Sequence, residues 1–239
     1  MGSKLILFLG CLLLISGSGH AQSVEEVLQR HFAAVGEESL APMRSVHIEM
    51  IERDGSGNTR IYQITKKRPN KIRKETEVKG FRYVAVFDGE YGQVLEGWLE
   101  DSIRDLSVQE QAVLEIESAI GSPLQLGSLP DHEISSMGFP QIAGQRYAKL
   151  RLTFYDNYFV DFYLDQQTHM IYKYVVFDEK SEKVAYELFY ANYKNLGGFV
   201  LPYSFEKRID DYNKVSYSMK DIVFGAGAAN SLFSLEQEP

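Results

Sequence analysis

The sequence describes an acidic chain of 239 residues, in which 25 Lys and Arg face 33 Asp and Glu for a formal net charge of −8. A negative balance of this size argues against a nucleic-acid backbone or an anionic membrane surface as the main partner. The one cysteine, Cys11, lies in an N-terminal apolar run. The rest of the chain therefore has no residue for a disulfide, a thiolate metal site or a cysteine nucleophile.

The first 21 residues have the pattern of a cleavable secretory signal peptide. A short basic start precedes the apolar run Leu5–Ile15, and small residues end the segment at Ala21. The run is too short to span a bilayer. We expect cleavage near Ala21–Gln22, which leaves an exported chain of residues 22–239. A lipid anchor on Cys11 fits less well, because the apolar run continues beyond this residue.

Two segments of the exported chain predict helices. Each opens with a capping box, in which a Ser and a Glu three residues later satisfy each other's backbone donors. The first begins at Ser23 and ends at Gly36, and the second begins at Ser107 and ends at Gly121. Each carries an apolar stripe that must be buried. No Pro-, Gly- or Ser-rich linker separates them, so we expect residues 22–239 to form one domain.

Nearly all the remaining residues predict β-strands, because apolar and polar residues alternate with a period of two. Residues 46–50, 61–66, 72–78 and 81–87 precede the second helix, and more strands follow between residues 144 and 224. Their short connections favour antiparallel hairpins. The helices are too few to cover nine or more strands. We predict a mainly β (α+β) fold, a strongly curved antiparallel sheet partly closed by two or three helical segments.

No group of titratable residues has the spacing of a catalytic or metal site. The histidines beyond residue 21, His31, His47, His132 and His169, follow no metal-ligand pattern. Gly-x-Ser-x-Gly, dinucleotide-binding and phosphate-binding motifs do not occur in the sequence. We therefore expect that the protein is not an enzyme and uses no cofactor or metal. An envelope hydrolase would need a His, Ser and carboxylate group that only the fold could assemble.

Aromatic residues are abundant, with 14 Phe, 15 Tyr and one Trp, and most lie on the apolar faces of the predicted strands. They are either the packed core of a sandwich or barrel, or the wall of a cavity that holds a hydrophobic ligand between the curved sheet and the second helix. The second interpretation predicts a ligand-binding wall made of Ile48, Met50, Leu150, Leu152, Phe154, Phe162, Leu164, Tyr186, Leu188, Leu201, Tyr203, Phe205, Tyr217 and Met219, with Val113, Ile116 and Ile120 from the second helix.

The segment Lys67-Arg68-Pro69-Asn70, followed by a strand and then Val86-Phe87-Asp88-Gly89, resembles the LolA-type outer-membrane lipoprotein-sorting proteins. Residues 54–57, 142–152 and 195–202 add to the resemblance, which covers roughly residues 23 to 236. The resemblance implies an unclosed antiparallel β-barrel with a helical lid over a hydrophobic cavity. It also implies a periplasmic monomer that carries an acylated lipoprotein or lipid, needs no cofactor and has inner- and outer-membrane transport proteins as partners.

The resemblance further implies a role for Arg68 in holding the lid closed. A guanidinium presents several fixed donors, which suit the carbonyl groups of a lid. The alternative is a surface arginine beside a proline at a strand edge. One departure concerns the Asp88-Gly89 turn, which a tryptophan closely follows in the family, whereas the sole tryptophan here is Trp98. The lid and its surroundings are therefore expected to differ from those of the carriers.

The main hypothesis is a periplasmic carrier or binding protein in which burial of acyl chains, at about 0.8 kcal/mol per CH₂, drives binding. A shared fold does not determine cargo, however. The alternative is a periplasmic interaction or sensor module of the same fold, which has a filled core and holds a protein partner on the outer surface of its sheet.

Overall fold

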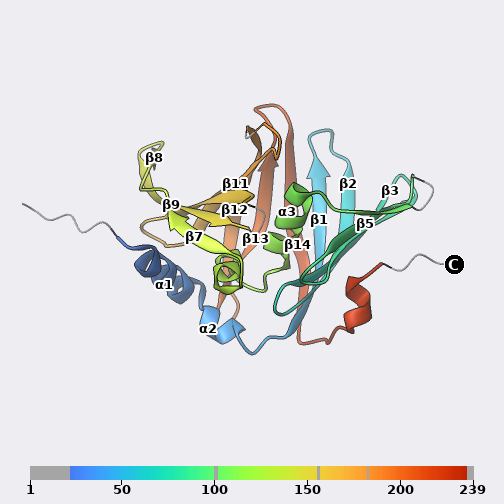
Figure 1. Cartoon of the computed structure of the whole chain (residues 1–239), viewed down its shortest axis with the longest axis horizontal. Helices are drawn as coiled ribbons and strands as arrows, with labels where there is room; N and C mark the ends of the chain where they lie inside the picture. Colours follow the sequence, from blue (N-terminus) through green and yellow to red (C-terminus); the bar gives the residue numbers. More distant parts are fainter. Residues whose placement is uncertain (1–21, 100–101, 155–156, 182, 236–239) are drawn as a thin grey trace, which may run out of the picture.

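The computed structural model describes residues 22–99, 102–154, 157–181 and 183–235, and its strands form one curved antiparallel sheet (Figure 1). The predicted signal peptide, residues 1–21, lies outside the described residues. Six strands precede helix α3 (Val108–Ser118) and lie side by side in chain order. They are β1 (Ser45–Asp54), β2 (Thr59–Lys67), β3 (Lys71–Val78), β4 (Phe81–Phe87), β5 (Gly92–Glu96) and β6 (Ser102–Asp105).

The strands of the second half follow α3 and also pair in chain order. They are β7 (Glu133–Ser136), β8 (Gln141–Ile142), β9 (Gln145–Thr153), β10 (Phe159–Asp165), β11 (Ile171–Phe177), β12 (Val184–Asn195), β13 (Val200–Arg208) and β14 (Lys214–Phe224). β7 pairs with β9, and the short β8 also pairs with β9. β1 and β14 join the two halves in antiparallel register, with Ile48 opposite Ile222. β6 and β7 form the two edges, so the sheet is unclosed, and the predicted fold class is confirmed.

The first helices lie at the N-terminal end, α3 and η1 (Pro123–Ser128) lie across the concave side of the sheet, and a short helix lies near the C-terminus beside β3 (Figure 1). The helices are α1 (Val24–Val35), the short α2 (Glu37–Leu40), α3 and the 3-10 helices η1 and η2 (Asn230–Phe233). Both predicted capping boxes are present, at Ser23 and at Ser107. α3 is shorter than predicted, because Ala119 leaves the helical conformation with ψ at 132°, and Ile120 therefore follows the helix.

Two clusters of buried side chains fill much of the concave side. One lies under α1 and η1 and contains Leu150, Leu152 and Phe162, all without exposed area. The other lies between α3 and the first half of the sheet, where Ile72 and Val94 are equally buried. Among the described residues, no helix is long and apolar enough to cross a bilayer.

Candidate ligand-binding cavity

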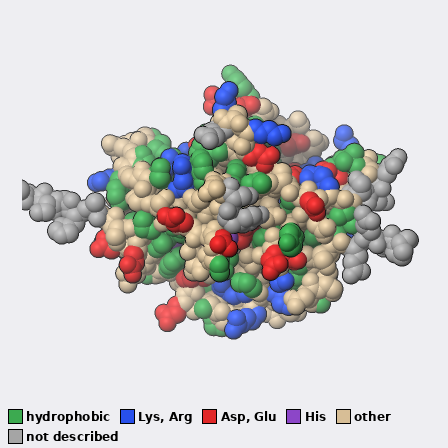
Figure 2. All heavy atoms as spheres, viewed as in Figure 1, with side chains coloured by type: hydrophobic (Ala, Val, Ile, Leu, Met, Phe, Trp, Pro, Cys, Tyr) green, Lys and Arg blue, Asp and Glu red, His purple; other side chains and the backbone are tan. Residues whose placement is uncertain are grey.

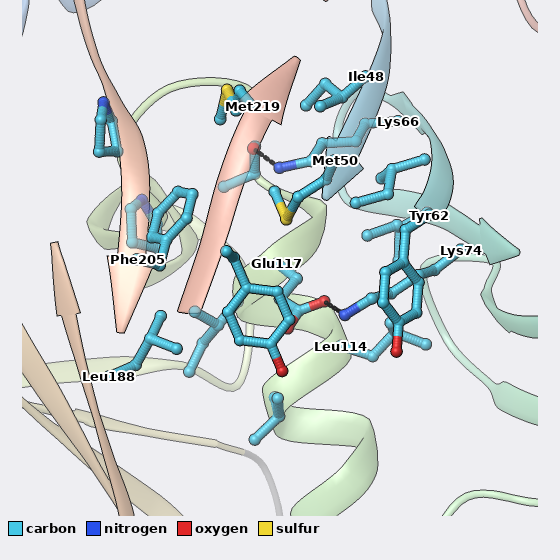
Figure 3. A pocket seen from close by; sticks show the side chains of 18 of the residues that line it. Ile48, Met50, Tyr62, Lys66, Lys74, Leu114, Glu117, Leu188, Phe205 and Met219 are labelled. Atoms are coloured by element: carbon cyan, nitrogen blue, oxygen red, sulfur yellow. Dashed lines mark hydrogen bonds and ion pairs between the residues drawn. The ribbon is translucent and has the colours of Figure 1, made fainter. Parts of the chain in front are cut away.

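A cavity of about 420 Å³ lies between α3 and the middle of the sheet (Figure 3). Strands β1 to β4 and β11 to β14 contribute to its wall. A volume of this size is within the usual range for sites that bind small molecules. The curvature of the sheet creates the space, since one 11-residue helix covers only part of the concave side.

Eleven of the residues predicted for a ligand-binding wall line this cavity. They come from both halves of the sheet and from the α3 segment: Ile48, Met50, Val113, Ile116, Ile120, Tyr186, Leu188, Leu201, Phe205, Tyr217 and Met219. Eight of them alternate along β1, β12, β13 and β14, and three come from the α3 segment. That they contact a ligand stays a prediction.

The structure places the other six predicted wall residues elsewhere. Five belong to the cluster under α1 and η1, and neighbouring side chains cover them completely or nearly so: Leu150, Leu152, Phe154, Phe162 and Leu164. The sixth, Tyr203, lies against Lys194, whose Nζ is 3.9 Å from the centre of the ring. β9 and β10 have the same alternation as the cavity strands, and only the position of the helices distinguishes a filled concave face from an open one.

Charged residues that the sequence patterns did not select also line the cavity. Lys66, Lys74 and Lys207 come from β2, β3 and β13, and Glu117 comes from α3. Lys74 Nζ lies 2.9 Å from a carboxylate oxygen of Glu117, and Lys66 Nζ donates to the Ala119 carbonyl at 3.0 Å (Figure 3). The alternation along the strands could have identified two of them. Lys66 has the same facing on β2 as the buried Tyr62 and Ile64, and Lys74 has the same facing on β3 as Ile72.

These lysines experience opposing electrostatic effects. Burial lowers the pKa of Lys66 to about 8, although the negative charge of Glu117 acts in the opposite direction. Burial also acts against the charged form of Lys74, but there Glu117 and two tyrosines outweigh it and raise the pKa above its usual range. Burial lowers the pKa of Lys207. Lys74 is therefore the lysine that Glu117 compensates best.

Arg68 connects the segment after α3 to the N-terminal helices. Its Nη2 donates to the Ile120 carbonyl at 2.9 Å and its Nη1 to Gln125 Oε1 at 2.8 Å. On the other side, the same guanidinium contacts Glu37 at 3.4 Å and donates to the carbonyls of α2 and the residues after it. Its side chain is 16% exposed, so it does not face solvent. A gating role for Arg68 stays a prediction.

Asn70, the last residue of the Lys67–Asn70 motif, forms a hydrogen bond with α3. Its Nδ2 donates to Glu115 Oε1 at 2.9 Å, and His132 Nε2 lies 3.3 Å from the same oxygen. Glu115 is 2% exposed. α3 has no basic residue in its last turn, so cations of the β2–β3 hairpin interact with the carbonyl groups at its C-terminal end.

A Ser–His pair lies nearby, between α1 and η1. His31 Nδ1 donates to the His169 carbonyl at 2.7 Å, and its Nε2 lies 2.7 Å from Ser122 Oγ. Burial lowers the pKa of His31 to about 4, so the ring is neutral at neutral pH and Nε2 accepts a hydrogen bond from the Ser122 hydroxyl. Ser122 is 3% exposed and its Oγ also caps η1 by accepting from Leu124 N. These contacts give the pair a structural role, since a substrate does not reach either side chain. Among the described residues, no group of His, Cys, Asp and Glu could hold a metal ion.

Comparison with known proteins identifies the fold. No family model matches the chain, and no curated protein matches it. Solved structures do. A LolA superfamily protein from Nitrosomonas europaea has 14% sequence identity and a TM-score of 0.61, with 89% of this chain and 98% of that chain covered.

Two further solved structures agree with this result. A domain from Vibrio parahaemolyticus that is assigned to outer membrane lipoprotein sorting has 15% identity and a TM-score of 0.56, over 87% of this chain and 94% of its own. A DUF1329 family protein from Desulfovibrio piger has 13% identity and a TM-score of 0.56, over 87% of this chain and 97% of its own. The chain therefore has the LolA-like fold that its sequence motifs predicted.

Proposed function

We propose that the protein is a periplasmic carrier or binding protein, and not an enzyme, that holds the acyl chains of a lipoprotein or lipid in the cavity under α3. The observation that carries the proposal is the cavity itself, about 420 Å³ of space between a helix and the concave face of the sheet. The LolA-like fold and the signal-peptide pattern of residues 1–21 support a periplasmic location.

The energetics of such a site are favourable. Burial of about ten CH₂ groups contributes about 8 kcal/mol. The loss of translational and conformational freedom offsets part of this gain. Affinity then depends on how little the wall must rearrange. The preformed wall, with Ile48 and Leu201 less than 10% exposed, favours binding without extensive ordering.

A pair of tryptophan substitutions on one strand tests the proposal. Met219 lines the cavity, whereas Ser218 precedes it on β14 and is exposed on the opposite face. Met219→Trp fills the cavity, and we expect it to weaken binding of a fluorescent fatty acid at least tenfold. Ser218→Trp adds the same ring outside the cavity, so it should leave the affinity unchanged.

Native mass spectrometry of protein purified from the periplasm provides an independent test. We expect lipid or acylated peptide to copurify. Absence of both in every preparation, together with no binding of the fluorescent fatty acid, would overturn the carrier proposal. A membrane regulator crosslinked without any lipid would instead support the interaction or sensor module. That alternative predicted a filled core, and the observed cavity favours the carrier.

A further inference from the structure

Three lysines face a cavity whose wall is otherwise mainly apolar. Lys66 and Lys74 lie on neighbouring strands, with Lys66 opposite Ile72 and Lys74 opposite Ile64. This diagonal arrangement places both side chains on the concave face within reach of one small group. Lys207 approaches from β13, and its Nζ lies 4.0 Å from the centre of the Tyr186 ring.

The carboxylates of the lining do not balance these lysines. The lining contains two acidic residues, Glu110 and Glu117. Both oxygens of Glu110 accept from Arg104 at 2.8 Å, so Glu110 is bound to a cation outside the lining, which it shares with Glu96. Glu117 acts on all three ammonium groups, and Glu52, which lies outside the lining, adds to its effect on Lys207. Among the described residues of the lining, three lysines thus outnumber two carboxylates, and one of these carboxylates contacts a lysine, in a chain with a net charge of −8.

This surplus is costly for a wall that only has to hold a hydrocarbon chain. A buried ammonium without a counter-charge loses much of its hydration free energy. Lys66 has a neutral carbonyl as its hydrogen-bond partner, and Lys207 has an aromatic ring. The lowered pKa values of both lysines reflect this incomplete compensation. On the molecular face in Figure 2, by contrast, acidic and basic side chains are interspersed.

Glu117 shows how a ligand could supply the missing charge. Its carboxylate enters the cavity from α3 and binds Lys74, as the head group of an amphiphile would (Figure 3). Phe205 and Leu188 approach from the side opposite Lys66 and Lys74 in the same view. Lys207 pairs with Leu188 across β12 and β13, so it reaches the cavity from this second side. Apolar residues from both halves of the sheet remain beside these lysines to contact an acyl chain.

We propose that the ligand is an anionic amphiphile, whose carboxylate or phosphate head group binds among Lys66, Lys74 and Lys207 while its acyl chain lies on the apolar wall. The inference rests on the proposed carrier function and restricts the cargo to acidic lipids. The head group shares Lys74 with Glu117 or replaces it there. Binding therefore weakens the contact between α3 and β3.

Three probes with one alkyl chain separate the contribution of the head group: dodecanoate, dodecyl phosphate and dodecanol. Each displaces a neutral fluorescent lipid from the delipidated full chain. We expect at least one anionic probe to bind about tenfold or more tighter than dodecanol, which corresponds to about 1.4 kcal/mol. A preference for the phosphate indicates a phospholipid head group, and a preference for the carboxylate indicates a fatty acid.

Variants test the residues named. Lys66→Met and Lys207→Met should each weaken anionic binding about tenfold and leave dodecanol unchanged, whereas Lys66→Arg should retain affinity. Glu117→Gln removes the competing charge and should strengthen anionic binding, which a merely damaged fold would not do. Lys220→Met is the matched control, because Lys220 is 55% exposed and pairs with Glu49 outside the cavity.

Two outcomes overturn the inference, and they are distinguishable. If dodecanol binds as tightly as both anions, or if the lysine variants weaken all three probes equally, the anionic head group is refuted and the carrier function remains. If none of the probes and no fluorescent lipid binds, the carrier function fails together with the inference.

Discussion

Replacement of Arg68 by alanine should destabilise the protein far more than a typical arginine substitution. The guanidinium joins three parts of the chain: α2, the residues that follow α3, and η1. Alanine leaves the Ile120 carbonyl and the Gln125 side chain without their shared donor, and it leaves Glu37 without its cation. These groups are largely buried, so water replaces the lost contacts only in part.

The magnitude follows from the geometry. The two shortest hydrogen bonds, to Ile120 at 2.9 Å and to Gln125 at 2.8 Å, involve a charged donor, and each such bond contributes about 1.5 to 3 kcal/mol. The contact with Glu37 is longer, at 3.4 Å, and contributes less. Because these contributions are not additive, we expect a loss of about 3 to 5 kcal/mol. Arg68→Lys retains the charge but not the planar fork and should lose about half as much.

Urea unfolding monitored by far-ultraviolet circular dichroism measures this loss. An unchanged slope of the unfolding free energy against urea concentration checks that the unfolded state is the same. Arg104→Ala is the control, since Arg104 is 42% exposed and its ion pairs should contribute less than about 1 kcal/mol. Hydrogen exchange should accelerate at residues 119–125. If Arg68→Ala changes the unfolding free energy by less than about 0.5 kcal/mol, the contacts of Arg68 do not stabilise the fold.

Two further predictions concern the N-terminal region. The pKa of His31 is lowered to about 4 in the folded protein, so the unfolded chain binds the proton more tightly. The contribution of His31 to the free energy of unfolding is therefore complete above about pH 6.5 and falls by about 3 kcal/mol as the pH decreases to 4. His31→Gln should show a shallower decrease of the unfolding free energy in the same urea titrations. An identical slope in both proteins would contradict this assignment. Gly36→Ala should cost more than about 2 kcal/mol in thermal and urea unfolding, because Gly36 has φ +70° and a Cβ there would lie 2.1 Å from the Gly198 carbonyl oxygen. Gly57→Ala, at φ +84° with no atom within 4 Å, is its control and should cost only about 1 kcal/mol; equal losses in the two variants would show that the close contact is relieved.

The sequence predicted the parts of the fold that local patterns encode. Both capping boxes, the end of α1 at Gly36 and strands β1 to β4 follow directly from residue types and alternation. Strands β5, β6, β7 and β8 were missed, because these short segments near the two ends of the sheet lack a long alternating run. Pairing between β1 and β14 depends on residues far apart in the chain, and no local signal specifies it.

The cavity was predictable in its apolar part and not in its charged part. Alternation identified residues such as Ile48 and Phe205 as concave, but it assigned the same role to Leu152, which η1 and α1 cover. Lys66 and Lys74 occupy inward positions on their strands, yet a lysine in a strand normally indicates a solvent-exposed face. Only the three-dimensional arrangement shows that both lysines line a cavity and that Lys74 pairs with Glu117.

The order of the strands limits the size of ligand that the proposed carrier could hold. The two edges of the sheet, β6 and β7, are consecutive strands, and residues 106–132, which include α3 and η1, run from one edge to the other across the concave side. This segment acts as a tether of fixed contour length, at most about 3.3 to 3.6 Å per residue when fully extended. If the proposed carrier spreads its edges around a bulkier ligand, the helical turns of this segment, at about 1.5 Å per residue, provide the length that can be drawn out. The capacity of the cavity and the helicity of α3 should therefore change together, so that large ligands leave α3 less helical than small ones.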